Sequence, residues 1–268
     1  MVIQKIVSLW LLIVVFISCS TAPITGRKQL ILIPDSQMLS MSYQQYDQFL
    51  SENKLSQNAQ KSKLVKDVGA RIQASVEQFM TKNGMGSRLQ DYRWEFNLVE
   101  SEEVNAWCMP GGKVVVYTGI LPITQTEAGL AVVMGHEIAH AIAEHGNERM
   151  SQGLLAQMGA VALTAALDEK PEQTQALWMT VYGVGAQYGV LLPYSRKQES
   201  EADQLGLIFM AMAGYDPNES VKFWERMSAG KSGQAPPEFM STHPSDQTRI
   251  NNLKRLIPEA MTYYPGSK

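Results

Sequence analysis

One stretch of the chain decides how the rest is arranged, and it reads Val133-Met134-Gly135-His136-Glu137-Ile138-Ala139-His140. Residues four apart lie on the same face of an α-helix, so His136 and His140 can share one metal ion. This is the HExxH pattern, in which two histidines bind zinc and Glu137, beside the first of them, acts as a general base. The pattern predicts hydrolysis of a peptide bond by a zinc-activated water.

The residues on both sides of this motif are almost all apolar. An HExxH string can occur by chance in an exposed helix, where its polar residues simply face solvent. Between residues 130 and 143, however, the other positions leave almost no solvated face, which predicts a buried helix. Burying two histidines and a glutamate is costly unless they are paired or bind a metal. We therefore favour a catalytic zinc site over an exposed polar face.

The composition is that of a globular protein with a substantial core. The chain has 268 residues, of which 45% are apolar and 18% charged, and its net charge is -3. Nothing in it is basic enough to indicate binding to nucleic acid. We expect one metallopeptidase domain over residues 36–258, followed by a C-terminal tail over 259–268.

The first residues have the composition of an export signal. A short start with Lys5 leads into the apolar run 6–17, which is too short to span a bilayer comfortably and is followed by Ser18 and Cys19. This arrangement resembles the lipobox of bacterial lipoproteins, in which the signal is removed before the cysteine and a lipid is attached to it. It predicts a signal peptide over residues 1–18 and lipidation of Cys19. An ordinary secretory signal or an uncleaved anchor is the alternative.

A lipid on Cys19 would tether the protein to a membrane through residues 19–35. The next residue is Ser20 rather than the Asp that retains many such proteins at the inner membrane. We therefore expect a lipid-anchored protein of the bacterial cell envelope, at the outer membrane and facing the periplasm. Cys108 would be the only cysteine of the mature chain, which excludes an internal disulfide.

The chain before the motif is predicted to form helices and then a small sheet. Apolar residues recur every three or four positions over 36–82, and strands are predicted over 92–99, 104–109 and 113–117. The expected fold class is α+β, mainly helical, with a zincin-type active-site helix beside a small antiparallel sheet. An extended substrate can pair with the edge of such a sheet through main-chain hydrogen bonds, but the sequence does not say which edge is open.

Thr124 and Glu127 have the spacing of a capping box and are predicted to begin the metal helix. We expect this helix to run to about His145 and to stop at Gly146. His145 is five residues past His140 and points to a different face. We interpret it as a polar residue at the helix C-terminus rather than a ligand.

Two apolar helical segments follow, over 154–167 and 178–192, separated by the charged residues 168–172. Each is shorter than a normal transmembrane helix, and both contain small residues suited to close packing. They predict a helical hairpin packed against or over the cleft. A hairpin that touches a membrane is the alternative.

A catalytic zinc needs three protein ligands and an open position for water. The extended metzincin pattern would need Gly and His where this chain has Ala143 and Gly146, so that class is excluded. The remaining candidates are acids on a later helix. Glu199 and Asp203 are four apart and share a face, whereas Glu201 lies about 200° around the helix from Glu199. On chemistry alone, either Glu199 or Glu201 can be the third ligand.

Three further stretches carry a family resemblance together with the HExxH motif, and they read Asn105-Ala106-Trp107, Pro110-Gly111-Gly112-Lys113-Val114 and Glu199-Ser200-Glu201-Ala202-Asp203 with Gly206. They resemble metallopeptidase family forty-eight, the HtpX-like and CAAX-protease-like zinc peptidases, over about residues 23–258. The start at Thr25-Gly26-Arg27 is typical of the soluble bacterial branch, which includes BepA-like and LoiP-like periplasmic lipoproteins.

The resemblance implies roles for the acidic residues. In this family the first Glu of an ExxxD motif binds zinc and the Asp supports the site. It therefore implies one zinc ion held by His136, His140 and Glu199, with Asp203 in support and Glu201 as a solvent-facing neighbour. It also implies unfolded or misassembled envelope proteins as substrates, met at the membrane to which the N-terminal lipid is attached.

A further histidine, His243, lies in a loop before a helix, which suits a functional role better than a core one. Family members resemble the chain here too, with Thr-His-Pro near the cleft. His243 can donate to the developing oxyanion or occupy the open zinc position in a latent form. The alternative is a hydrogen bond that only fixes the loop. Arg249 can anchor the same loop through a carboxylate that the sequence does not identify.

Two other functions are compatible with the sequence. The first is a chaperone-like module that binds client proteins while its zinc site stays latent. The second is a structural zinc protein without turnover, which requires four protein ligands and no open position.

Overall fold

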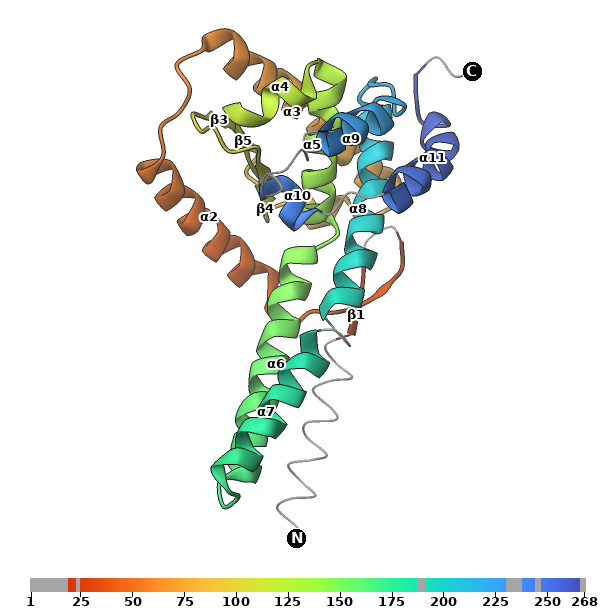
Figure 1. The fold of residues 1–268 in the computed structure, drawn as a ribbon. Coiled ribbons are helices and arrows are strands. Elements are labelled where there is room, and N and C mark those ends of the chain that lie inside the picture. Colours follow the sequence, from red (N-terminus) through yellow and green to blue (C-terminus); the bar gives the residue numbers. More distant parts are fainter. Residues whose placement is uncertain (1–18, 23–24, 188–190, 230–237, 244–246, 266–268) are drawn as a thin grey trace.

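The structure is a computed structural model that describes residues 19–22, 25–187, 191–229, 238–243 and 247–265. The predicted signal peptide, 1–18, lies outside the described residues. The described chain forms one main body, from which a hairpin of two helices projects (Figure 1). The elements before the central sheet are β1 (Cys19–Thr21), β2 (Lys28–Leu30), α2 (Asp35–Glu52), α3 (Ala59–Lys82) and η1 (Gly86–Leu89).

The central sheet has three strands, β3 (Glu95–Val99), β4 (Ala106–Met109) and β5 (Lys113–Tyr117), in the order β3-β5-β4. β4 pairs antiparallel with β5, but β3 pairs parallel with β5, so the expectation of a wholly antiparallel sheet was wrong. The turn at Gly111 and Gly112, both with positive φ, folds β5 back between β4 and β3. β3 then runs in the same direction as β5. The mainly helical α+β class is confirmed.

The open edge of this sheet is β4. On the other side, the backbone of residues 54–56 bonds to β3 through Ser56 N to Leu98 O and Glu100 N to Lys54 O. Within the described part of the chain, no strand lies beyond β4. β4 packs against the metal helix instead, so its free edge borders that helix.

The metal helix is α5 (Glu127–Ile142), which follows η2 (Thr118–Ile120) and α4 (Leu121–Thr124). Every residue from 129 to 142 is buried, as predicted. The cap is Thr126, whose side chain accepts a hydrogen bond from Gly129 N, so the predicted start at Thr124 was two residues early.

The end of this helix also differs from the prediction. Glu144 takes a left-handed φ of 59°, and a new helix, α6 (His145–Leu167), begins directly after it. The predicted stop at Gly146 was therefore wrong, because the break falls two residues earlier and Gly146 lies inside α6. The break changes the direction of the chain between His140 and His145.

The helix that crosses α5 is α8 (Leu192–Met212), and this is the most extensive helix contact of the fold. The two backbones approach closely where Gly135 faces Gly206. A Cβ on Gly206 would lie 2.9 Å from His136 N. This approach brings the face of α8 that carries Glu199 and Asp203 beside His136. The remaining helices of the body are α9 (Glu219–Ala229), α10 (Glu238–Thr242) and α11 (Gln247–Met261).

The projecting hairpin consists of α6 and α7 (Glu172–Ala186). The predicted hairpin is present, but its second helix is α7 rather than the predicted 178–192, of which residues 188–190 lie outside the described residues. The hairpin projects from the body rather than lying against or over the cleft (Figure 1). α6 has 23 residues because it also includes residues 145–153, which lie before the predicted segment. Among the described helices, α6 is long and apolar enough to cross a membrane, judged by length and composition alone.

Candidate metal and active site

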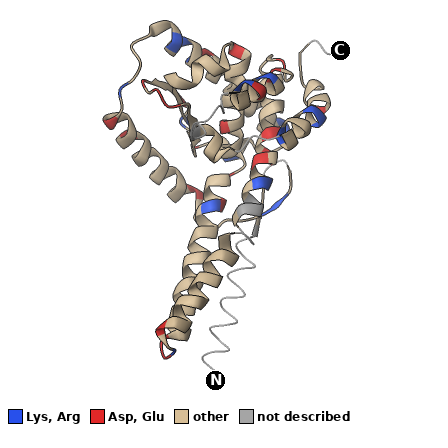
Figure 2. Ribbon diagram, in the orientation of Figure 1, with Lys and Arg blue, Asp and Glu red and all other residues tan. Residues whose placement is uncertain are grey.

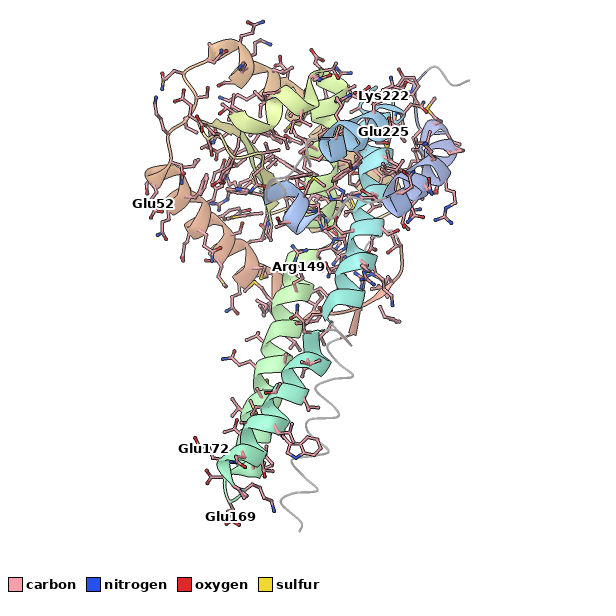
Figure 3. The ribbon with its side chains drawn as sticks, in the orientation of Figure 1. Glu52, Arg149, Glu169, Glu172, Lys222 and Glu225 are labelled. Carbon is pink, nitrogen blue, oxygen red and sulfur yellow. The ribbon has the colours of Figure 1, made fainter. Side chains whose placement is uncertain are left out.

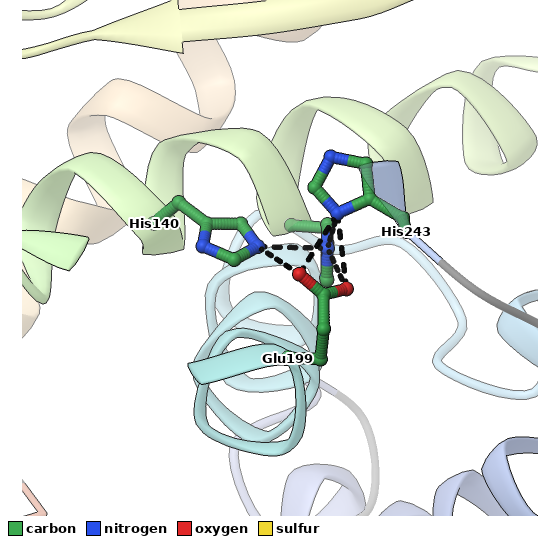
Figure 4. A group of neighbouring side chains, drawn as sticks. His140, Glu199 and His243 are labelled. Atoms are coloured by element: carbon green, nitrogen blue, oxygen red, sulfur yellow. Dashed lines mark hydrogen bonds and ion pairs between the residues drawn. The ribbon is translucent and has the colours of Figure 1, made fainter. Parts of the chain in front are cut away.

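Four side chains meet at the crossing of α5 and α8, namely His136, His140, Glu199 and His243. They offer ligand atoms that all lie within 4.8 Å of one another. Figure 4 shows three of them, His140, Glu199 and His243, pointing toward one another. His136 and His140 come from consecutive turns of α5, Glu199 comes from α8, and His243 directly follows α10. The three histidines are buried. The site thus joins segments that are more than 100 residues apart in the sequence.

The distances in this cluster fit a shared cation. His136 Nε2 lies 3.1 Å from His140 Nε2 and 3.2 Å from His243 Nδ1. Glu199 Oε1 lies 3.2 Å from His140 Nε2 and 3.0 Å from His243 Nδ1. In a tetrahedral zinc site with Zn–N bonds of about 2.0–2.1 Å, ligand nitrogens are about 3.3 Å apart. The donor set therefore fits zinc.

Glu137 is buried beside the cluster and holds a polar atom without a hydrogen bond. Its Oε1 accepts none, although His243 Nε2 is 3.3 Å away. Burial raises the pKa of Glu137 above its ordinary value. A buried carboxylate oxygen without a donor, next to a metal-ligand cluster, is in position to take a proton from a substrate water.

Asp203 and Arg249 support His136 from behind. Asp203 Oδ1 lies 3.1 Å from His136 Nδ1, so that nitrogen donates its proton and leaves Nε2 free for the cluster. Arg249 donates to both oxygens of Asp203, at 3.0 and 2.6 Å, and to Glu199 Oε2 at 3.1 Å. Its guanidinium stacks 3.8 Å above the ring of Trp224. Asp203 and Glu199 are thus the carboxylates that anchor Arg249.

The pKa values of the cluster indicate that, without a metal ion, a proton lies between its histidines and carboxylates. Burial lowers the pKa of His136, but the carboxylates of Asp203 and Glu199 outweigh it and raise the pKa to about 9. Burial keeps the pKa of His140 well below its ordinary value. Burial opposes ionisation of Glu199, yet its bonds to His136, His140 and His243 hold its pKa well below the usual range. One proton is therefore held where a metal ion would bind.

His145 supports His140 in the same way, a role that the sequence pattern did not predict. His145 Nδ1 lies 2.8 Å from His140 Nδ1, and its Nε2 lies 3.0 Å from Glu201 Oε2. Because His140 Nε2 faces the cluster, its Nδ1–H donates to His145, and His145 Nε2–H donates to Glu201. The interpretation of His145 as a polar helix end was wrong, since it is fully buried at the start of α6.

Glu201 is not the solvent-facing neighbour that the resemblance implied. It is 5% exposed, because the far face of α8 meets the N-terminal segment rather than water. Arg27 Nε donates to Glu201 at 2.8 Å, and Arg27 Nη2 pairs with Glu148 at 2.7 Å. The Thr25 hydroxyl also donates to Glu201. The Thr25-Gly26-Arg27 start therefore connects to His140 through Glu201 and His145.

Comparison with known proteins gives the family. The model of peptidase family M48 matches residues 67–257, a range that contains the whole metal-ligand cluster. This chain belongs to peptidase family M48. The M48 region also contains the HExxH motif and the ExxxD motif that predicted the family from the sequence.

Curated relatives are similar in sequence to this M48 chain over part of their length. It is 39% identical to the mitochondrial metalloendopeptidase OMA1 of Schizosaccharomyces pombe over 176 residues, which cover 65% of this chain and 50% of that protein. It is 34% identical to the human mitochondrial metalloendopeptidase OMA1 over 256 residues, covering 92% and 47%. It is 27% identical to the beta-barrel assembly-enhancing protease of Escherichia coli over 183 residues, covering 64% and 37%.

The chain thus spans about half the length of the OMA1 relatives it matches. The family prediction is confirmed. Its finer part, the BepA/LoiP-like lipoprotein branch, is not, because the OMA1 relatives are more similar to this chain than the beta-barrel assembly-enhancing protease is. That branch stays a prediction.

Neither cysteine of the M48 chain belongs to the metal-ligand cluster of the described residues. Cys19, the predicted lipidation site, opens β1, where its backbone pairs with Leu30 of β2. Cys108, in β4, is a free thiol, and burial raises its pKa well above the ordinary value. It is therefore not a reactive thiolate.

A pocket borders the metal ligands of this M48 chain on the side of α2. Its lining includes Met38, Leu89, Cys108, His140 and Arg149. It lies next to the free edge of β4, because Cys108 belongs to both. The pocket can therefore receive a side chain from a peptide that lies along β4.

Proposed function

We propose that this chain is a zinc-dependent endopeptidase. The observation that carries the proposal is the cluster at the α5–α8 crossing, with the buried carboxylate of Glu137 beside it. His136, His140 and Glu199 would hold a zinc ion, and Asp203 orients His136. An ion bound there would polarise a water and the scissile carbonyl.

Glu137 moves the proton in this mechanism. Its Oε1, which accepts no hydrogen bond in the structure, would take a proton from the attacking water and return it to the nitrogen of the leaving amine. Burial helps, because a raised pKa brings the carboxylate closer to the proton affinity that both transfers require.

His243 has two roles open to it, and its position favours the one that limits activity. Its Nδ1 lies 3.0 Å from Glu199 Oε2 and 3.2 Å from His136 Nε2. We assign it a latent role, in which it would add a fourth protein ligand in a resting form and would have to withdraw before a substrate water could bind. This position also supports the second candidate, a chaperone-like client-binding module with a latent zinc site.

The free edge of β4 favours extended polypeptides as substrates. Main-chain pairing with β4 places a peptide across α5 and requires little of its side chains. Substrates with unfolded segments satisfy this requirement best. We propose unfolded or misassembled envelope proteins as the physiological class.

The proposed location is the bacterial cell envelope. Support comes from the export signal at residues 1–18 and from the lipobox-like position of Cys19. A lipid on Cys19 would anchor the chain, and Ser20 favours the outer membrane, facing the periplasm. Metabolic labelling with a radioactive fatty acid, in the wild type and in Cys19→Ala, tests this part.

Casein degradation by the full-length protein tests the activity. Cleavage should stop with a chelator and return when zinc is added back. Glu137→Gln should lose about 10²–10⁴-fold in rate while it keeps its zinc. If the wild type with bound zinc cleaves no casein but prevents its aggregation, and Glu137→Gln does the same, the client-binding function replaces the endopeptidase.

A further inference from the structure

The α6–α7 hairpin exposes most of the large apolar side chains found at the surface. Nine of the eleven such residues among the described ones lie on it, and they are Met150, Leu154, Leu155, Met158, Val161, Leu177, Trp178, Val181 and Val184. α7 has no buried residue. Monomeric soluble proteins rarely expose a contiguous apolar surface of this kind.

Charge is arranged along the hairpin in three zones. Residues 150–167 and 173–195 contain no Asp, Glu, Lys or Arg. The tip between the helices is acidic, with Glu169 and Glu172 at its end, whereas the base carries the exposed Arg149 (Figures 2 and 3). Further exposed basic residues near the base are Lys28, Arg196 and Lys197.

We propose that this hairpin inserts into a lipid bilayer, with the basic base at the phosphate groups and the tip towards the opposite leaflet. The uncharged part of α6, residues 150–167, is about 27 Å long at 1.5 Å per residue. The hydrocarbon core of a bilayer is about 30 Å thick. The length and the charge zones therefore match a bilayer.

Three hydroxyl groups of the hairpin are satisfied by the backbone of the hairpin itself. The hydroxyl of Thr164 donates to Ala160 O, and that of Thr180 donates to Ala176 O. The Tyr182 hydroxyl donates to Ala156 O and joins the two helices. Polar groups must find such internal partners in lipid, where water is absent.

A bilayer fits this surface better than a protein partner does. The uncharged part of the hairpin, residues 150–167 of α6 and 173–186 of α7, forms a shaft that carries no Lys, Arg, Asp or Glu on any side (Figure 2). A second copy of the chain, or its own apolar run 6–17, would cover one side and leave the other in water. Lipid covers all sides at once. Insertion would also hold α5 and the cluster close to the membrane surface, whether or not the chain cleaves peptides.

The test uses Trp178, which lies on the hairpin and is 52% exposed. Full-length protein is reconstituted in vesicles of phosphatidylcholine and phosphatidylglycerol whose acyl chains are brominated near their ends. The Trp178 signal is the difference in emission between the wild type and Trp178→Phe. We expect this signal to be quenched by the bromolipid and to be shielded from aqueous iodide.

Two test variants on the hairpin are compared with one control variant on the body. Val161→Glu and Val184→Glu place a charge on the shaft and should each weaken insertion about a hundredfold. Leu55→Glu, at a 41% exposed apolar residue of the body, should leave the Trp178 signal quenched.

Three outcomes would overturn the proposal. If the protein binds vesicles but iodide still quenches Trp178, the hairpin lies outside the bilayer. If Trp178 is shielded from iodide in the absence of lipid, and this shielding increases with protein concentration, a second copy of the chain covers the hairpin. Shielding without lipid at every concentration indicates the chain's own apolar run 6–17.

Discussion

Only two residues, Ala143 and Glu144, separate α5 of the α5–α8 crossing from α6 of the α6–α7 hairpin, yet the surfaces of these two regions are opposite. The crossing buries ionisable side chains, with His136, Glu137 and Asp203 each at most 6% exposed. The hairpin exposes apolar side chains, and the most exposed large one, Val161, has 65% of its surface in contact with solvent. Folded proteins normally do the reverse in both respects.

The difference indicates that each region needs a non-protein partner to be stable. Buried imidazoles and carboxylates are costly without counter-charges, and the crossing gathers them around a position that suits a cation. Exposed apolar surface is costly in water, and the hairpin suits hydrocarbon. The following predictions compare the effects of substitutions at the crossing with the effects of similar substitutions at exposed positions.

The largest effect is expected at the buried ion pair of the crossing. Asp203→Asn leaves Arg249 without its strongest partner at a side chain that is 7% exposed, which should cost about 3 kcal/mol in the free energy of unfolding. Asp67→Asn removes an exposed pair with Lys63 and should cost less than about 1 kcal/mol. Urea denaturation of the metal-free proteins measures both, and equal losses would show that the Asp203 pair is not structural.

The close approach of the two backbones should be next in size. Gly206→Ala places a Cβ 2.9 Å from His136 N, so α5 and α8 must separate, at a cost of about 1–3 kcal/mol. Its zinc content should fall as well, because Glu199 moves away from His136. Gly153→Ala on α6 meets nothing within 4 Å and should be neutral or stabilising. If Gly206→Ala keeps its zinc content, the close contact between the α5 and α8 backbones does not determine the position of Glu199 beside His136.

Removal of the support behind His140 should weaken metal binding. Glu201→Gln loses the charge that holds His145 and Arg27, and zinc affinity should fall about 10–100-fold. Glu225→Gln, an exposed residue of α9 labelled in Figure 3, is the matched control and should bind zinc like the wild type. Competition with a chromophoric chelator measures both affinities. An unaltered affinity in Glu201→Gln would leave the contact with the N-terminal segment without a role at the metal.

Zinc binding should release a proton near neutral pH. The pKa of metal-free His136 is raised to about 9, so its ring is protonated at pH 7 and must lose that proton to bind zinc. Affinity should therefore fall about tenfold for each pH unit below 9. Calorimetry in two buffers with different ionisation enthalpies counts the protons, and a count of zero at pH 7 would contradict the pairing with Asp203 and Glu199.

The smallest effect is expected on the hairpin in water. Val161→Ala on α6 should change the free energy of unfolding by less than about 0.5 kcal/mol. The same change at Val133 on α5, which is 1% exposed, should cost about 2 kcal/mol. Thermal denaturation without lipid compares them. A loss at Val161 as large as that at Val133 would show that the hairpin is covered by protein in solution.

Much of the metal site could be predicted from the sequence because it depends on the helical repeat. His136 and His140, like Glu199 and Asp203, are four residues apart, and each pair shares one helix face wherever the helix lies. The apolar neighbours of the HExxH motif likewise predicted that α5 is buried. The placement of Glu201 on the side of its helix away from Glu199 was also correct.

What could not be predicted is what each face meets. Glu201 was assigned to solvent because the helix repeat does not say that Arg27, 174 residues earlier, covers the far side of α8. The parallel pairing of β3 with β5 was missed for a related reason, since strand patterns give no order in a sheet.

By itself, the sequence determined the ligand pair, the burial of the helix that carries it and the uncharged shaft of the hairpin, because these follow from residue type and local periodicity. Only the tertiary structure decided that His145 turns back to His140, since this depends on the left-handed φ of Glu144. It also decided that Arg249 and Arg27 complete the site from opposite sides. These contacts join segments far apart in the chain, and their geometry arises only when α5 and α8 pack together.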